Sequence, residues 1–332
     1  MEDRQEMTLE KYDFQVKNRY RARGAVLLDT NEGPLLLREQ NRITGHFALE
    51  NEIKEHLRQQ GMIHLDFAVA NREGELVTEW DTGEKYVVYR WFRGEECDYR
   101  NPQDLRAMAE NLGKLHRCLH NYYEEPVPLS EPLLVQYDRH NREMKRVYTY
   151  MKEKKRKTEF ECYAMQRFGL FYDRAKRARE QLEKSPYYHN HGVFTRDLCH
   201  GEYNYHNLLF SRQGLATTNF EHAAPGVQLM DLAYFMRKTM EKNRWQPEKG
   251  RMIWEGYVRE VPCEGGELEF LATVLSYPIK YWKLLNQYIN GKKTWISNKS
   301  IEKLKTVCEQ EENKEKFLER MPSFEKNTGK EG

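Results

Sequence analysis

The sequence predicts an α+β fold of two lobes, in which a small antiparallel sheet with one main helix precedes a larger, mainly helical lobe. Strand-like apolar runs surround a single helical pattern between residues 20 and 92, whereas apolar residues recur at helical spacing in most segments after residue 101. A chain of 332 residues can build two lobes with cores of their own. We therefore expect an N-terminal lobe over residues 1–93, a helical lobe over residues 94–322 and a polar tail over residues 323–332.

The composition indicates a folded protein with a very polar surface. Charged residues make up 32% of the chain and apolar residues 39%, and an aromatic share of 12% supplies bulky groups for a core. The net charge of +2 predicts no general attraction to nucleic acid or to an anionic membrane. Met1 to Asp13 is charged, and no stretch approaches the roughly 20 apolar residues of a membrane span. We expect no signal peptide, no membrane insertion and residence on the cytoplasmic side.

The small lobe begins with a hairpin and a helix. Residues 20–38 hold two apolar runs joined by the turn Thr30 to Gly33, which predicts two antiparallel strands. After Thr44 and Gly45, the segment Phe47 to Gln60 has helical spacing, and its apolar face carries one acid, Glu50.

Two further strand-like runs, residues 65–70 and 85–92, complete the sheet on either side of the polar segment 71–84. The strand pattern gives way to helix at Arg93 to Glu96, which marks the lobe boundary. Asn101 and Pro102 then open an amphipathic helix that continues to Leu119.

The large lobe is expected to hold a helical hairpin from Tyr137 to Ser185, whose two arms meet at the run Lys152 to Lys157. Such a charge run is typical of a solvated face, with an anionic partner as the alternative. Asp231 is expected to cap the helix Leu232 to Lys242, because a carboxylate satisfies free helix donors. Helices are also expected over residues 270–289 and 301–318.

The segment Leu198 to Asn207, followed by Thr218 to Glu221, has the layout of a phosphotransferase catalytic loop and metal motif. That chemistry uses a loop carboxylate to accept a hydroxyl proton, an Asn that reaches a magnesium ion, and a second carboxylate that holds the metal. Glu202 and Asn207 fit the loop spacing, but Asn219 stands at the metal-carboxylate position. Glu221 shares a face with Asn219 if the backbone is extended, and it would then supply the missing charge.

These residues resemble the bacterial CotS-type spore coat proteins, a branch of the aminoglycoside phosphotransferase and choline kinase superfamily with a protein-kinase-like fold. The resemblance extends in order over most of the chain. Its other pieces are Arg23, Gly24, Thr30 and Gly33; Tyr89, Trp91, Gly94 and Glu95; Leu112, Leu115 and His116; Asp231, Leu232, Ala233 and Tyr234; and Tyr281, Trp282, Tyr288, Lys293 and Trp295.

The resemblance implies a site for ATP and Mg²⁺. Glu202 matches the catalytic Asp and His200 shapes its loop, so both are candidate catalytic residues; Asn207, Asn219 and Glu221 are candidate metal ligands. Arg38 stands where the family has a phosphate-contacting Lys, and Glu50, with Glu52 as the alternative, is the helix acid expected to pair with it. The backbone of Trp91, Phe92 and Arg93 corresponds to the adenine hinge.

Two functions follow from this resemblance. The three replacements Arg38, Glu202 and Asn219 favour a spore coat protein with degenerate or weak phosphotransferase activity and a structural role among other coat proteins, with metal binding weakened by Asn219. The alternative is an active ATP- and Mg²⁺-dependent kinase that phosphorylates a hydroxyl of a sugar or amino alcohol. Nucleic-acid binding is disfavoured by the balanced charge, and the histidines 189, 191, 200 and 206 lack the ligand set of a closed zinc site.

Overall fold

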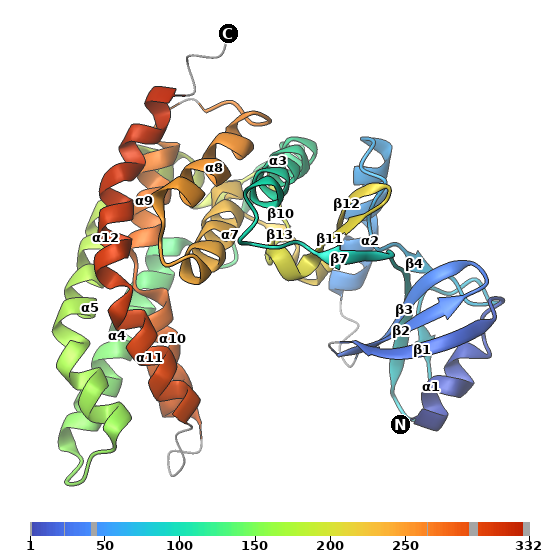
Figure 1. The fold of residues 1–332 in the computed structure, drawn as a ribbon, viewed down its shortest axis with the longest axis horizontal. Coiled ribbons are helices and arrows are strands. Elements are labelled where there is room, and N and C mark those ends of the chain that lie inside the picture. The colour runs from blue at the N-terminus through green and yellow to red at the C-terminus, as the bar shows by residue number, and fades with distance from the viewer. Residues whose placement is uncertain (1, 23, 41–44, 264, 292–297, 328–332) are drawn as a thin grey trace. The chain divides into compact units, whose positions relative to one another are not determined.

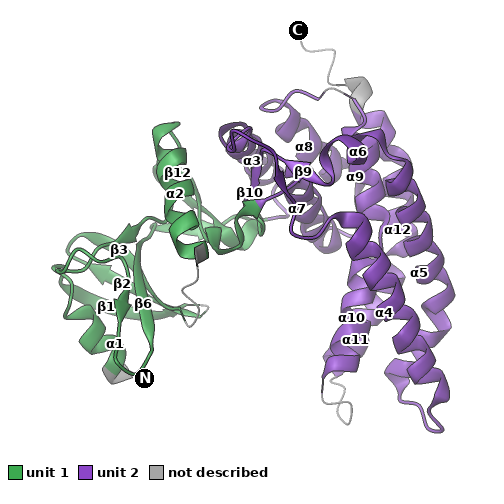
Figure 2. Cartoon of the chain, turned by 180° about the vertical axis from the view of Figure 1, so that it is seen from behind, with its two compact units in different colours: residues 1–98, 200–224 green, residues 99–199, 225–332 purple. Residues whose placement is uncertain are grey.

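Two units, each with its own core, make up the chain in the computed structural model, which describes residues 2–22, 24–40, 45–263, 265–291 and 298–327. Unit 1 comprises residues 1–98 and 200–224, and unit 2 comprises residues 99–199 and 225–332 (Figure 2). The segment 200–224, expected in the helical lobe, therefore groups with the N-terminal residues. Thr44, Arg23, Lys293 and Trp295 lie outside the described residues, as does the tail beyond residue 327.

Unit 1 is built on a six-stranded antiparallel sheet (Figure 1). The predicted hairpin is confirmed, since Thr30 and Gly33 face each other at the turn, where Gly33 has a φ of 108° that suits glycine. The strand order is β1-β2-β3-β6-β4, with β5 pairing β6. The bounds are α1 Glu2–Leu9, β1 Val16–Ala22, β2 Ala25–Thr30, β3 Gly33–Glu39, α2 Gly45–Gln59, β4 Ala68–Val69, β5 Thr78–Glu79 and β6 Lys85–Arg90.

The two faces of this sheet are covered by different segments because successive side chains of a strand point to opposite sides. On one face Leu35 and Leu37 of β3 pack with Leu9, Tyr12 and Phe14 from the N-terminal segment. On the other face Leu36 packs with Val87, Tyr89 and Phe47 of α2. Arg38, two residues beyond Leu36, therefore belongs to the α2 face.

A second, three-stranded sheet of unit 1 carries the candidate loop. Its order is β12-β11-β7, formed by β7 Gly94–Glu96, β11 Leu208–Ser211 and β12 Gly214–Thr217. The short helices η1 Tyr205–Asn207 and η2 Phe220–His222 flank β11 and β12. The expectation of helix directly after Arg93 was wrong, because Gly94 to Glu96 pair with Ser211 to Leu209 as a strand.

Unit 2 is mainly helical. Asn101 accepts a hydrogen bond from the Gln103 amide and caps α3, as predicted, and α4 and α5 form the predicted hairpin around the 154–158 connection. The helices are α3 Pro102–Leu119, α4 Leu133–Glu153, α5 Glu159–Lys184, α6 Pro186–His191, α7 Gln228–Lys242, α8 Pro247–Val258, α9 Glu267–Ser276, α10 Ile279–Asn290, α11 Asn298–Glu309 and α12 Glu311–Arg320. The shorter elements are β8 Val127–Pro128, β9 Phe194–Thr195, β10 Leu198–Cys199, β13 Ala224–Pro225 and η3 Met321–Asn327.

One capping prediction in unit 2 was wrong. The helix α7 begins at Gln228 with Val227 at its N-cap, so Asp231 lies within the first turn. Its buried carboxylate is 3.4 Å from His116 Nε2, whose other ring nitrogen lies 2.9 Å from the Tyr257 hydroxyl. Asp231 therefore links α7 to α3 instead of capping a helix. Within the described ranges, no helix is both long and apolar enough to cross a membrane.

Candidate functional site

His200 holds the candidate catalytic loop in place through hydrogen bonds at both of its ring nitrogens. Its ring is fully buried and packs against Phe220 at a centroid distance of 4.7 Å. Nε2 lies 3.1 Å from the Thr218 carbonyl oxygen, and Nδ1 accepts a hydrogen bond of 3.2 Å from the Glu202 amide. The carbonyl contact requires the proton on Nε2, which leaves Nδ1 as the acceptor. His200 thus connects the loop to the metal motif and positions Glu202, and its ring is not exposed to a substrate.

Gly201 lies close against the backbone of His222. Its φ is 79°, and a Cβ added there would lie 2.0 Å from the His222 carbonyl oxygen. Gly201 therefore approaches the backbone that directly follows the metal motif. The glycine is required where the two segments meet.

Gly201→Ala is expected to destabilise unit 1 more than an ordinary positive-φ glycine would. The left-handed conformation destabilises an alanine by about 1–3 kcal/mol. In addition, the alanine Cβ would overlap with the His222 carbonyl oxygen, and only a shift of the backbone relieves that overlap. Gly83→Ala is the matched control, because Gly83 has a φ of 92° and no atom within 4 Å of the added Cβ. Urea unfolding of both variants measures the difference, and equal losses would show that the His222 contact has no cost.

Glu202 presents a partly exposed carboxylate beside the loop backbone. Its side chain is 36% exposed, and Oε2 lies 3.6 Å from Nε2 of the exposed His222. The Glu202 carbonyl oxygen accepts hydrogen bonds of 2.9 Å from the side-chain amides of Asn204 and Asn207. The loop backbone is therefore tied on both sides, which is the arrangement that a catalytic carboxylate needs.

Asn207 connects the loop to the metal motif. Its Nδ2 donates to Glu202, as above, and its carbonyl oxygen accepts from the amide and the hydroxyl of Thr218. Asn207 therefore ties its own loop together by hydrogen bonds. The Oδ1 atom of the same amide is the group that would face a metal.

The metal motif has an unusual local backbone. Asn219 adopts a left-handed conformation, with φ 67° and ψ 65°, which Asn tolerates better than most residues. The next three residues form η2, so the segment is not extended and the condition under which Glu221 would share a face with Asn219 is not met. Glu221 is exposed.

Arg38 and Asn219 contact each other directly. Arg38 Nη1 donates a hydrogen bond of 3.0 Å to Asn219 Oδ1. That oxygen is the only side-chain atom of Asn219 that can bind a cation, and Mg²⁺ sites normally use one or two carboxylates together with phosphates. Asn219 supplies no carboxylate and its oxygen already accepts from a cation, so Arg38 and Asn219 do not fit a magnesium site of the usual kind. Within the described chain, no group of three His, Cys, Asp or Glu side chains is arranged to hold a metal ion.

Glu50 has a partner other than the expected Arg38. Lys54, one helical turn later in α2, lies 2.5 Å from Glu50 Oε1 and 2.9 Å from Asp66 Oδ1, and also donates to the Asp66 carbonyl oxygen. Lys54 is fully buried, and Glu50 and Asp66 are 4% and 2% exposed. Burial raises the pKa of Glu50 above its usual value, and the charge of Lys54 opposes that shift. We call Glu50, Lys54 and Asp66 the buried triad.

The buried triad is joined to the metal motif. Asp66 Oδ2 accepts a hydrogen bond of 2.9 Å from the backbone amide of Asn219. The Lys54 ammonium also lies 4.9 Å from the centre of the Tyr89 ring and 5.7 Å from that of Phe220. Sequence reasoning missed Lys54 and Asp66, although Lys54 follows Glu50 by four residues on the apolar stripe of α2. The fallback acid Glu52 is exposed.

The expected hinge residues connect β6 to β7. The Trp91 amide donates to the Pro34 carbonyl oxygen at 3.0 Å, and the Trp91 ring packs against the core cluster of Leu36, Val87 and Tyr89. Phe92 is half-buried, and the exposed Arg93 forms an ion pair of 2.8 Å with Asp29. The Trp91 amide is therefore engaged within the sheet.

The comparisons with known proteins agree on one kind of fold. The family model described as "Spore coat putative kinase YutH" matches residues 5–321. An aminoglycoside phosphotransferase from Alicyclobacillus acidocaldarius superposes with a TM-score of 0.82 at 15% identity, over 96% of this chain and 95% of that one. The amicoumacin kinase hAmiN, in a complex with AMP-PNP, Ca²⁺ and Ami, gives a TM-score of 0.63 at 13% identity, over 95% and 93%.

A microcompartment-associated aminopropanol kinase gives a TM-score of 0.63 at 14% identity, over 97% of this chain and 98% of that one. No curated protein matches the sequence. At these identities the solved structures establish a kinase-like fold alone, with an antiparallel sheet in the N-terminal part and helices in the C-terminal part, as the sequence predicted.

Proposed function

Because this chain belongs to the spore coat putative kinase YutH family, we propose that it is a kinase-like coat protein whose phosphotransferase activity is degenerate or weak and whose main role is structural. The family confirms the resemblance to CotS-type coat proteins. The proposal adds that the residues at the nucleotide and metal positions of the fold bind one another instead of ATP and Mg²⁺.

The hydrogen bond from Arg38 to Asn219 is the observation that carries this proposal. An active site of this fold uses a cation on β3 for phosphate and a carboxylate in the metal motif for Mg²⁺. Here the Arg38 guanidinium of β3 donates to the side-chain oxygen of Asn219. Glu50 is paired with Lys54 in the buried triad and not with Arg38. Charge stabilisation of the transferring phosphoryl group is usually the largest catalytic contribution, so its loss outweighs an intact loop.

The geometry of the loop favours a second candidate function. Glu202 is held by backbone contacts with its carboxylate partly exposed, as a general base would be, and base catalysis contributes roughly 10²- to 10⁴-fold. The alternative is therefore a slow ATP- and Mg²⁺-dependent kinase acting on a hydroxyl of a small molecule. Glu202 would then accept the hydroxyl proton, and Arg38 would leave Asn219 for phosphate.

Thermal-shift titrations with ATP, with and without Mg²⁺, separate the two functions. The variant Arg38→Lys/Glu202→Asp/Asn219→Asp restores the residue types that the superfamily uses, and Asn18→Asp is a control that adds one exposed carboxylate to unit 1. A ligand at 100 times its dissociation constant stabilises by roughly 2.7 kcal/mol. We expect Mg²⁺-dependent stabilisation by ATP in the triple variant and little in the native protein or the control.

Strong stabilisation of the native protein that requires Mg²⁺, together with consumption of ATP, would establish the active kinase and refute the degenerate one. If neither the native protein nor the triple variant responds to ATP, the assignment of Arg38 and Trp91 to a nucleotide site is wrong.

A further inference from the structure

The two units carry opposite net charges, which the balanced total of +2 conceals. Unit 1 has 15 Lys and Arg against 22 Asp and Glu, a net charge of −7. Unit 2 has 39 Lys and Arg against 30 Asp and Glu, a net charge of +9. A chain with two oppositely charged units attracts further copies of itself at low ionic strength. Each excess is concentrated in one region.

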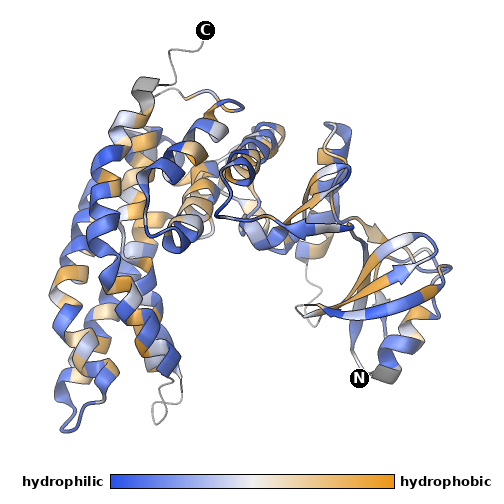
Figure 3. Ribbon diagram, in the orientation of Figure 1, coloured by the Kyte–Doolittle hydropathy of each residue, from blue (hydrophilic) through white to orange (hydrophobic). Residues whose placement is uncertain are grey.

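The positive excess of unit 2 lies on α4 and its connection to α5. Residues 133–158 hold nine Lys and Arg against three Asp and Glu. Figure 3 shows this connection in the blue of hydrophilic residues. Arg139 and Lys154 are paired with Glu131 and Glu161, whereas Arg142, Lys145 and Arg146 are exposed and form no ion pair with any described residue.

These three cations line a hollow. It has a volume of about 460 Å³, and the described residues around it are Arg142, Lys145, Arg146, Thr149, Tyr150 and Glu153. Residues three and four apart in a helix lie roughly 5–6 Å from each other on one face, so the cations form a compact cluster. The α4 basic face, defined as Arg142, Lys145 and Arg146, is a concave cationic surface with hydroxyl groups at its edge.

The negative excess of unit 1 includes an acidic segment, residues 73–84, which contains β5 and is called the acidic loop below. It holds Glu73, Glu75, Glu79, Asp81 and Glu84, with no Lys or Arg among them. Glu79 and Glu84 have ion pairs with Lys85 and Arg4, but Glu73, Glu75 and Asp81 are exposed and form none within the described chain.

The start of the acidic loop is held in shape by one side chain. Asn71 Oδ1 accepts hydrogen bonds of 3.0 and 2.9 Å from the amides of Glu73 and Glu75, and the Asn71 amide donates to the Glu75 carbonyl oxygen. Asn71 is 7% exposed and anchored against Thr78. The backbone that carries the two neighbouring carboxylates is therefore already ordered, which lowers the cost of binding.

We propose that this protein associates head to tail, with the acidic loop of one copy seated on the α4 basic face of the next. This inference rests on the proposed structural role in the coat, to which it adds the partner and the surfaces. The occupant is a second copy because the chain carries both members of the complementary pair. The two surfaces differ, so the interface is heterologous, and repetition extends an assembly instead of ending at a dimer.

Charge reversal tests this proposal in sedimentation velocity at low salt and at about 0.5 M NaCl, where screening is strong. The face variant is Arg142→Glu/Arg146→Glu, and the loop variant is Glu73→Lys/Glu75→Lys. The control Arg177→Glu/Lys184→Glu makes the same charge change on exposed, unpaired residues of α5. We expect the native protein and the control to associate at low salt, and each test variant to weaken association about tenfold or more.

An equimolar mixture of the face and loop variants is expected to associate again, because each interface then joins opposite charges. Recovery in the mixture also proves that both variants are folded. A native protein that stays monomeric at every concentration overturns the proposal, even if it binds polyglutamate, which would indicate a foreign acidic partner. Equal losses in the test and control variants, or no recovery in the mixture, overturn it as well. Detection of kinase activity would refute the proposed function alone, since association is measured without nucleotide.

Discussion

Replacing Lys54 by methionine is expected to lower the free energy of unfolding by about 3–5 kcal/mol, because the carboxylates of Glu50 and Asp66 then remain buried without a cationic partner. Lys54 is fully buried and lies within 2.9 Å of the carboxylates of both Glu50 and Asp66. Methionine fills much of the same volume, so the loss reports on charge more than on packing. Urea unfolding at neutral pH measures it.

Two further variants show that the loss comes from the buried triad. Arg58→Met removes a cation from the same helix where it is 58% exposed and paired with Glu55, and exposed pairs contribute only about 0–1 kcal/mol. The neutral triple variant Lys54→Met/Glu50→Gln/Asp66→Asn has no stranded charge and should recover part of the stability. A Lys54→Met protein as stable as the Arg58→Met control would contradict the role given to the triad.

The elements that the sequence predicted correctly are those set by local patterns. Thr30 and Gly33 specify their hairpin turn, and Asn101 with Pro102 specifies the start of α3, because turn and cap residues act within a few positions. By contrast, the three-residue strand β7 exists only through its pairing with β11, more than 100 positions later. Asp231 has the residue type of a cap, but its carboxylate lies beside His116 of another helix, which a single sequence does not reveal.

The candidate site divides in the same way. The spacing of His200, Glu202 and Asn207 places them correctly in one loop, since those contacts span only a few residues. The contacts of Arg38 with Asn219 and of Lys54 with Asp66 were not predicted, because they depend on how β3 meets the metal motif and how α2 meets the segment before β4. A Glu and a Lys four residues apart on an apolar stripe was the available signal for the buried triad.

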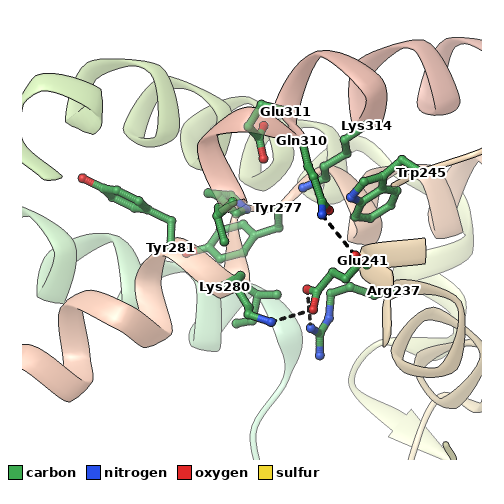
Figure 4. A pocket seen from close by; sticks show the side chains of 12 residues that line it. Arg237, Glu241, Trp245, Tyr277, Lys280, Tyr281, Gln310, Glu311 and Lys314 are labelled. Carbon is green, nitrogen blue, oxygen red and sulfur yellow. Dashed lines mark hydrogen bonds and ion pairs between the residues drawn. The ribbon is translucent and has the colours of Figure 1, made fainter. Parts of the chain in front are cut away.

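Unit 2 contains a second buried lysine, beside a small cavity of about 30 Å³ (Figure 4). Lys314 of α12 is 6% exposed, and its ammonium lies 5.5 Å from the centre of the Trp245 ring and 3.4 Å from the Ser276 carbonyl oxygen. The nearby Glu241 is already engaged, since it pairs with Arg237 at 2.8 Å and with Lys280 at 2.7 Å. Lys314 therefore has weak compensation for its burial.

This burial makes the stability of unit 2 depend on pH. Burial lowers the pKa of Lys314 from 10.5 to about 7, with Arg174 and Arg237 adding to the shift and Glu241 and Glu315 opposing it. Between these two values the unfolded chain binds a proton that the folded chain does not, so the free energy of unfolding rises with pH across that window. Below pH 7 both states are protonated, and the folded protein bears the full cost of a buried ammonium.

Lys314→Met is therefore expected to stabilise the protein at and below pH 7 by about 4–5 kcal/mol, since the pKa falls from 10.5 to about 7 and one pKa unit corresponds to about 1.4 kcal/mol. The advantage should shrink steadily as the pH rises from 7 toward 10.5, because the folded lysine is then neutral while protonation of the unfolded chain becomes progressively less favourable. Lys316→Met is the matched control on the same helix, because that ammonium is 62% exposed and paired with Glu312. Urea unfolding from pH 6 to 10 measures both variants. If Lys314→Met destabilises the protein equally at every pH, the folded protein bears no net cost for the buried Lys314 ammonium, and the expected pH dependence is wrong.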